Sequence, residues 1–244
     1  MRRAKTGALV CVVIVIAAVT ACTPSNRPLR DISTVAVTST GHTPVLIVPG
    51  WALECRQGPP TEWKAWTNAF VAAGWSDTEV DVLDYDACAP ASQTAELVGH
   101  AVDALLERTG QKKVDLIAHS MGAIAMRWCV RFGSCRGKVD KAVTLSGANH
   151  GTVWAKACPL QYWSKACPDL DSSSTALAAL NKGDETPNDV EWQTWVSICE
   201  VVIVPRASAG LKGADNHDVT DRCVFHDDWK RDRPTIHSVV SWFD

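Results

Sequence analysis

Val114-Asp-Leu-Ile-Ala-His-Ser-Met-Gly122 is the stretch that decides how this chain folds. It begins with apolar, β-branched-rich residues typical of a buried strand, and the residues that follow it, 123–130, have helical spacing without a breaker. Small residues at Ala118 and Gly122 flank Ser120. A serine on a sharp turn between strand and helix has a strained backbone that leaves no room for large neighbours. The stretch therefore predicts that Ser120 is lifted out of the fold as a nucleophile.

Strands and helices alternate on both sides of this turn. Strands are expected at residues 44–50, 79–84, 113–118, 138–145, 192–199 and 219–225, and helices at 63–73, 92–108, 123–130 and 235–243, the last with Asp232 as its N-cap and Pro234 in its first turn. Residues 152–194 have weaker periodicity and are expected to pass over the site as an irregular excursion. This order predicts an α/β fold with a mostly parallel, doubly wound sheet, helices on both faces, and ligands at the carboxyl ends of the strands.

Chain length and net charge exclude some classes of binding partner. The chain has 244 residues and a net charge of -3, which fits one medium domain with a sizeable core and gives no basic surface for nucleic acid. We therefore expect a small-molecule or lipid substrate, no nucleic acid, and a monomer.

The N-terminal residues predict export. A basic start is followed by an apolar run at residues 8–19 that is too short to span a membrane comfortably, and the run ends in Val19-Thr-Ala-Cys22. This end is similar to a bacterial lipobox, so we expect a lipoprotein-type signal peptide at 1–21, lipid modification of Cys22, a flexible tether at 22–40 and a catalytic domain at 41–244. The protein would then be held at the membrane of a bacterial cell envelope by its lipid anchor alone. A simple signal peptide, giving a secreted protein, is the alternative.

Eight of the ten cysteines lie in the expected catalytic domain. An even number in an exported protein predicts disulfides, and the shortest closures would pair Cys55 with Cys88, Cys129 with Cys135, Cys158 with Cys167 and Cys199 with Cys223. Eight cysteines allow 105 connectivities, so this pairing is a hypothesis. Zinc-type spacing is absent from the sequence, and no metal is expected.

Three motifs carry a resemblance to a known family. Pro49-Gly-Trp51, the Ala-His-Ser-Met-Gly elbow at 118–122 and Ser146-Gly-Ala-Asn-His-Gly-Thr152 resemble secreted bacterial lipases and esterases of the α/β-hydrolase fold, over most of residues 41–244. Two departures stand out: Pro49-Gly50 replaces the usual His-Gly, and the expected acid is a glutamate where aspartate is more frequent. Neither removes the chemistry, since the oxyanion donors are backbone groups and a carboxylate is still present.

The resemblance implies the other members of the site. A serine hydroxyl needs a base to take its proton and an acid to orient that base. In the α/β-hydrolase fold these residues occur along the chain in the order serine, acid, histidine. The turn that carries Glu200 is similar to the acid-bearing turn of these lipases, so Glu200 is the expected acid. Asp215 and Asp218 are the alternative candidates. His226, which precedes the loop to the final helix, is the expected base, ahead of the other two downstream histidines, His217 and His237.

Backbone N–H groups complete the expected site. The resemblance assigns the oxyanion donors to Met121, directly after the nucleophile, and to Trp51, in the loop after the first strand. His119 and His150 are expected to be structural neighbours of the site.

The resulting prediction is a cofactor-free serine carboxylic ester hydrolase, a lipase or esterase, that acts through an acyl-enzyme on lipid-like or short-chain esters. A thioesterase, polyester depolymerase or acyltransferase would use the same residues. The alternative from another class is an inert exported lipoprotein that uses the fold as a binding module.

Overall fold

The computed structural model describes residues 39–51, 55, 60–160 and 165–244, and the side chains of Cys158, Pro159 and Leu160 are outside that description. The predicted signal peptide, Cys22 and nearly all of the tether also lie outside the described residues. Within the described part, no helix has both the length and the apolar character needed to cross a membrane.

Six strands of the described chain form one sheet in which every neighbouring pair is parallel. They are β1 (Val45–Val48), β2 (Val80–Val82), β3 (Val114–His119), β4 (Val139–Leu145), β5 (Glu191–Ser197) and β6 (Asp215–Val219), in the spatial order β2-β1-β3-β4-β5-β6. The chain adds β2 on one side of β1 and then β3 on the other, so the winding reverses between β1 and β3. Ligands of doubly wound sheets bind beyond the carboxyl ends of the strands at such a reversal.

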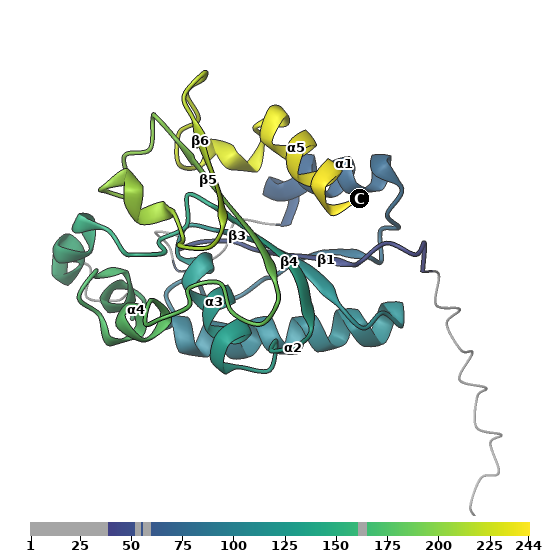
Figure 1. Ribbon diagram of the computed structural model, residues 1–244, viewed down its shortest axis with the longest axis horizontal. Coiled ribbons are helices and arrows are strands. Elements are labelled where there is room, and N and C mark those ends of the chain that lie inside the picture. The colour runs from purple at the N-terminus through teal and green to yellow at the C-terminus, as the bar shows by residue number, and fades with distance from the viewer. Residues whose placement is uncertain (1–38, 52–54, 56–59, 161–164) are drawn as a thin grey trace, which may run out of the picture. The chain divides into compact units, whose positions relative to one another are not determined.

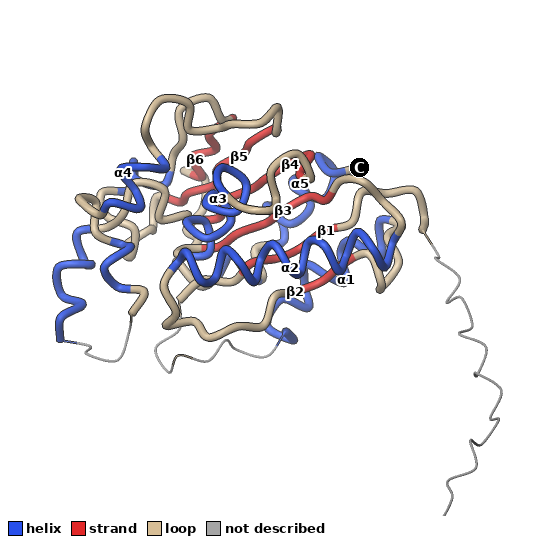
Figure 2. Tube along the Cα trace, turned by 90° about the horizontal axis from the view of Figure 1, so that it is seen from below, coloured by secondary structure: helices blue, strands red, loops and turns tan. Residues whose placement is uncertain are grey.

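Helices cover both faces of the sheet (Figures 1 and 2). One face carries α2 (Ala91–Thr109) and α3 (Gly122–Phe132), and the other carries α1 (Lys64–Ala73) and α5 (Arg233–Phe243). Shorter helical segments are α4 (Thr175–Leu180) and the 3-10 turns η1 (Pro60–Trp63), η2 (Val153–Leu160), η3 (Cys167–Leu170), η4 (Arg206–Ala209) and η5 (Asp228–Lys230). The predicted α/β-hydrolase fold is confirmed.

The face of the sheet on which a side chain is buried follows from the alternation of residues along each strand. Successive residues of a strand point to opposite faces, and in β1 Leu46 and Val48 pack in the core with α2 and α3, whereas Val45 and Ile47 pack in the core with α1 and α5. Such strands are apolar at every position because both faces are covered. A third cluster, which includes Met121, packs α3 against α4 and the Glu200 loop.

One predicted strand is wrong. We expect a strand at 219–225, but β6 occupies Asp215–Val219, and residues 220–225 form a turn and loop. The reason is that β6 is the edge strand of the described sheet, where β5 is its one neighbour, and its residues Asp-Asn-His-Asp are mostly exposed and polar. An edge strand needs no apolar run, so hydrophobic pattern alone does not find it. The cap of α5 is as predicted, because the Asp232 carboxylate accepts from the Thr235 N–H and a proline lies in the first turn.

Disulfides staple the loops. Cys55 is bonded to Cys88, Cys129 to Cys135 and Cys199 to Cys223, which confirms three of the four expected pairs. Cys167 is disulfide-bonded as well, but its expected partner, Cys158, has a side chain outside the described part, so this pair stays a prediction. Disulfides persist in oxidising compartments, which indicates an exported or extracellular protein.

Candidate active site

Ser120 lies on the turn between β3 and α3, with a φ of 54° that L-residues rarely adopt. Its backbone is held on both sides, because its N–H donates to the Leu145 carbonyl at 3.1 Å and its carbonyl accepts from the Ala148 N–H at 3.0 Å. Both partners belong to the end of β4 and the loop after it. The neighbouring strand thus holds the serine in its strained conformation, and the residue as a whole is 7% exposed.

Two glycines allow the backbone after β1 to approach this turn. A Cβ at Gly122 would lie 2.4 Å from the Pro49 carbonyl oxygen, and a Cβ at Gly50 would lie 2.7 Å from the Ser120 Cβ. Real Cβ atoms do not come so close to other heavy atoms. The Pro49-Gly50 and elbow motifs are therefore two sides of one contact at the reversal of the sheet.

Glu200 lies in the turn after β5, where its side chain is fully buried. Its Oε1 accepts from the N–H groups of Val202 at 2.7 Å and Ile203 at 2.9 Å, and its Oε2 pairs with Nδ1 of His226 at 2.9 Å. Burial raises the pKa of Glu200, but the hydrogen bond and charge of His226, with further hydrogen bonds from Ser146 and Ile203, outweigh burial and hold the pKa at about 2. The carboxylate is therefore ionised at any pH at which the protein would work.

The loops that carry Glu200 and His226 are tied together. Cys199 and Cys223 are bonded, and the Ser197 hydroxyl oxygen accepts from the N–H groups of both Cys199 and Val224. A covalent link and a shared acceptor thus fix the spacing of Glu200 and His226. Supporting contacts of this kind hold a site in a defined geometry.

His119 joins the serine turn to the His226 loop. Its Nε2 lies 2.8 Å from the His226 carbonyl oxygen, and since a carbonyl only accepts, Nε2 carries the proton. Burial and the nearby His226 ring lower the pKa of His119 to about 3, so this ring is neutral. The sequence expectation of a structural neighbour agrees with this contact.

Ser120 makes no hydrogen bond to His226 among the described residues. Both lie at the carboxyl ends of the strands, and their loops meet through the contact between His119 and His226. Catalytic hydrogen bonds are often long in free enzymes and tighten when substrate binds.

The expected oxyanion donors lie beside the serine. Met121 is buried directly after Ser120, and its N–H donates no hydrogen bond within the described part of the chain. Trp51 follows the Gly50 contact and packs, half-buried, against the cluster that contains Met121.

The alternative acids and bases are elsewhere. Asp215 and Asp218 are exposed on β6, where they pair with His217 and Arg206. His217 stacks on Trp195 with ring centroids 4.0 Å apart, and His237 is exposed on α5. The structure brings Glu200 together with His226 and with none of these four alternatives.

Sequence reasoning did not find Ser146 and Trp229. The Ser146 hydroxyl, buried at the end of β4, accepts from Nε1 of Trp229 at 2.7 Å and lies within hydrogen-bonding reach of Glu200. Ser146 also has a positive φ of 41°. Its position at the start of the Ser-Gly-Ala-Asn-His-Gly-Thr motif was the available signal, but the 83 residues that separate it from Trp229 hide the contact.

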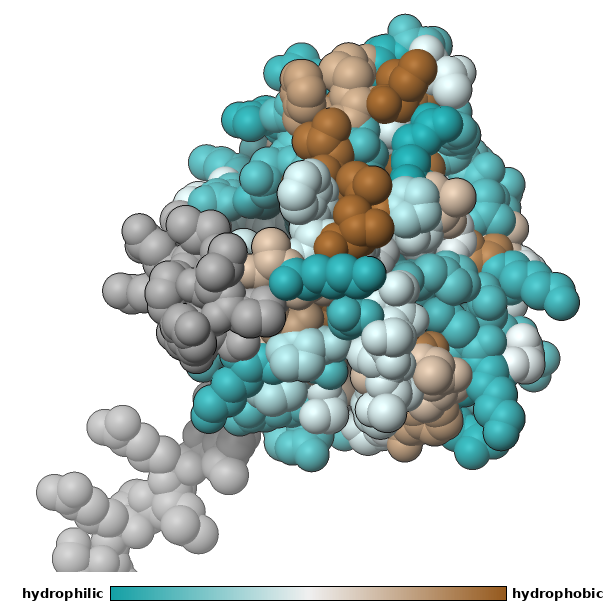
Figure 3. Space-filling model, turned by 90° about the vertical axis from the view of Figure 1, so that its left-hand side faces the viewer, coloured by the Kyte–Doolittle hydropathy of each residue, from teal (hydrophilic) through white to brown (hydrophobic). Residues whose placement is uncertain are grey.

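An apolar pocket adjoins the site. The described residues border an open pocket of about 240 Å³ between Trp51 and Val202. Its lining consists of Trp51, Thr152, Trp154, Ala155, Ala157, Cys167, Leu170 and Val202. Large apolar side chains are exposed nearby in the chain, among them Trp154 at 59% and Val201 at 60%. Figure 3 looks onto the side of the molecule toward which β1 runs and shows apolar side chains gathered in a stripe there.

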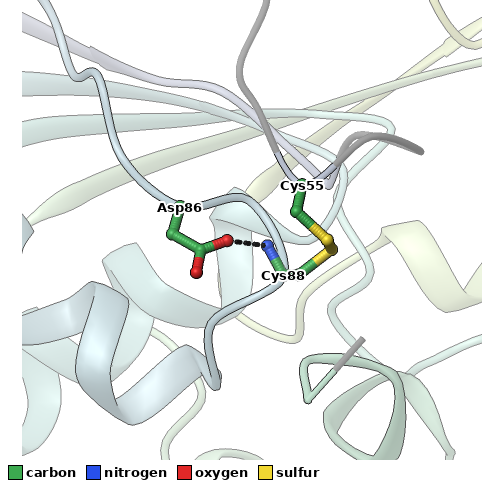
Figure 4. Close-up of side chains that lie close together, drawn as sticks. All are labelled: Cys55, Asp86 and Cys88. Atoms are coloured by element: carbon green, nitrogen blue, oxygen red, sulfur yellow. Dashed lines mark hydrogen bonds between the residues drawn. A yellow bond between two sulfur atoms is a disulfide. The ribbon is translucent and has the colours of Figure 1, made fainter. Parts of the chain in front are cut away.

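A cluster of two cysteines and one carboxylate brings three potential metal ligands within 4.8 Å of one another. Figure 4 shows that the sulfurs of Cys55 and Cys88 are bonded to each other, while Asp86 accepts from the Cys88 N–H at 2.9 Å. A disulfide offers no thiolate, and the thiolate is the form of cysteine that binds metals. The cluster therefore serves as a staple for the loops after β1 and β2.

The sequence pattern of the family described as lipase (class 2) matches residues 42–234, a span that contains every site residue above. The chain belongs to this family. Membership supports a lipolytic hydrolase of the α/β-hydrolase type.

Two solved structures are similar to this chain in fold. Aspergillus fumigatus lipase B is 17% identical to this chain, with a TM-score of 0.68. The match covers 85% of this chain and 54% of the fungal protein, so this chain spans about half the length of that relative. The mature form of Bacillus licheniformis lipase BlEst2 is 14% identical, also with a TM-score of 0.68, over 83% of this chain and 92% of its own. At such identities the likeness concerns the fold alone.

Proposed function

We propose that this protein is a serine carboxylic ester hydrolase that works through an acyl-enzyme. The observation that carries the proposal is the 2.9 Å hydrogen bond between Nδ1 of His226 and the buried carboxylate of Glu200, beside the strained turn of Ser120. The ionised carboxylate holds the proton on Nδ1, which leaves Nε2 of His226 to accept one.

In the first half of the reaction, the Ser120 hydroxyl oxygen attacks the ester carbonyl carbon while Nε2 of His226 takes the hydroxyl proton. Glu200 stabilises the imidazolium that forms. The oxygen of the tetrahedral intermediate accepts from the N–H groups of Met121 and Trp51. The intermediate collapses, the alcohol leaves with the proton from His226, and the acyl group stays on Ser120.

In the second half, water replaces the alcohol. His226 takes a proton from the water as its oxygen attacks the acyl carbon, and returns a proton to the Ser120 oxygen as the acid departs. Each step needs only these side chains and water, so we propose no cofactor and no metal.

The pocket beside Trp51 supports an ester with an apolar acyl group as the substrate. Its lining is mostly apolar, which suits the acyl part of an ester, and Trp51 places it next to the proposed oxyanion donors. A short-chain p-nitrophenyl ester is the substrate of choice for a first assay.

A covalent serine probe separates this proposal from an inert binding module. We expect the folded protein to react with a fluorophosphonate and the adduct to map to the peptide that contains Ser120, because an activated serine attacks such a phosphorus centre. Thiol- and amine-directed probes serve as controls for nonspecific labelling. Folded protein that stays unlabelled, or labelling at another serine, would refute the assignment.

We also propose that Cys22 carries a lipid that anchors the protein to the bacterial envelope, with residues 22–40 as the tether. One acyl chain holds a protein at a membrane only weakly, whereas several chains on one residue hold it stably. Cys22→Ala is expected to move the protein from the membrane fraction to the soluble exported fraction, as measured by fractionation and intact mass. Wild-type protein that is soluble and has no acyl mass would contradict the anchor and leave a simple signal peptide.

A further inference from the structure

The loop that carries His226 is held at two points by strand ends. His119, the last residue of β3, donates from Nε2 to the backbone carbonyl of His226 at 2.8 Å. Three residues along the loop, Trp229 donates from Nε1 to the hydroxyl of Ser146, which follows β4, at 2.7 Å. The side chains that make these two contacts, those of His119, Ser146 and Trp229, are all buried.

Each contact has a defined direction. His119 is neutral and can donate from one ring nitrogen only, and a carbonyl only accepts. The indole of Trp229 is a donor only, so the Ser146 hydroxyl accepts from it and keeps its own proton for the Glu200 carboxylate, which lies within reach. Ser146 therefore holds the His226 loop at Trp229, and its hydroxyl also helps to lower the pKa of Glu200.

Buried tryptophan side chains hold both of these contacts in place. The carbonyl of Trp229 accepts from Nε1 of Trp66 in α1 at 2.9 Å, and the ring of His119 has its centroid 5.9 Å from that of Trp63. Trp63, Trp66 and Trp229 are among the largest fully buried side chains of the described structure. A loop residue that is anchored in this way cannot shift without leaving buried polar groups unpaired, which is costly.

We propose that His119 and Ser146 are positioning residues that clamp the loop from His226 to Trp229, and that the clamp fixes the His226 ring against Ser120. The inference rests on the proposed function, because it gives His226 the role of base. In this proposal His119 neither touches substrate nor transfers a proton. Its part is to set the distance across which the Ser120 proton moves, a distance to which proton transfer is sensitive.

The test compares variants at each point of the clamp. His119→Leu removes the donor to the loop, and His119→Gln places an amide N–H near the position of Nε2. Trp229→Phe removes the indole N–H and keeps an aromatic ring. Trp75→Phe is the matched control, since Trp75 is also a buried indole, donates to the Thr43 carbonyl at 2.8 Å, and lies away from Glu200 and His226.

We expect His119→Leu and Trp229→Phe to lower kcat about tenfold to hundredfold on a short-chain p-nitrophenyl ester, with KM changed less than threefold. His119→Gln should recover most of the loss, and Trp75→Phe should stay within twofold of wild type. Rates are measured on the whole disulfide-bonded chain and are expressed per serine titrated to completion with a fluorophosphonate, so misfolded protein does not enter kcat.

A double-mutant cycle separates positioning from general stability. If His119 acts through His226, His119→Leu should change the residual rate of His226→Ala by less than twofold. An equal loss in both backgrounds, equal losses in Trp229→Phe and Trp75→Phe, or kcat within twofold of wild type in both His119→Leu and Trp229→Phe would each overturn the clamp. If His226→Ala itself keeps wild-type activity, the proposed function has failed instead.

Discussion

Ser120→Ala is expected to lower hydrolysis of a short-chain p-nitrophenyl ester by about 10⁵–10⁶-fold in kcat, the effect typical of removing the serine of a triad. Without the hydroxyl no acyl-enzyme forms, and only the oxyanion donors and substrate binding remain. The fold should be unaffected, since alanine keeps the Cβ and therefore the same backbone strain at a φ of 54°. The measurement is a steady-state assay of purified protein alongside its melting temperature.

The matched control is Ser238→Ala, which removes an exposed hydroxyl on α5 that donates to the Pro234 carbonyl. This variant should keep wild-type activity. Ser120→Ala protein that melts like wild type and keeps more than about 1% of its activity would mean that another residue is the nucleophile.

The serine turn could be predicted because its causes are local. An apolar strand, small flanking residues and a helix without a breaker are consecutive in the sequence around Ser120, so one window contains the whole signal. The close approach of Gly50 is different. The Pro49-Gly-Trp motif is visible in the sequence, but the need for glycine comes from a residue some 70 positions away. A Cβ at Gly50 would lie 2.7 Å from the Ser120 Cβ, and only the fold shows this contact.

The last strand and the contacts of the His226 loop show where sequence reasoning ends. β6 is polar because it is an edge, and its register against β5 depends on pairing rather than on an apolar pattern. His119 reaches His226 across 107 residues, and Ser146 reaches Trp229 across 83. Hydrogen bonds between such distant residues leave no periodicity, so residue type and spacing could suggest Glu200, His226 and the Cys199–Cys223 link between their loops, but not the hydrogen bonds that hold the His226 loop.

His226 and His237, which lie on either side of the Asp232 cap, offer the sharpest test of the base. His226→Ala is expected to lower kcat by about 10⁵–10⁶-fold, comparable to Ser120→Ala, because residues that act as a unit fail together. His237→Ala should stay within twofold of wild type, since His237 is exposed on α5 and the Glu200 carboxylate is hydrogen-bonded to His226.

Both variants replace a histidine of the same C-terminal segment and differ in what the ring contacts, which makes each the control for the other. Steady-state kcat and KM, with melting temperatures, are the measurement. A larger loss in His237→Ala would move the base to α5 and would leave the hydrogen bond between Glu200 and His226 with a structural role only. Equal small losses in both would instead leave Ser120 without a base, and the strained serine turn would then be a feature of the fold rather than of catalysis.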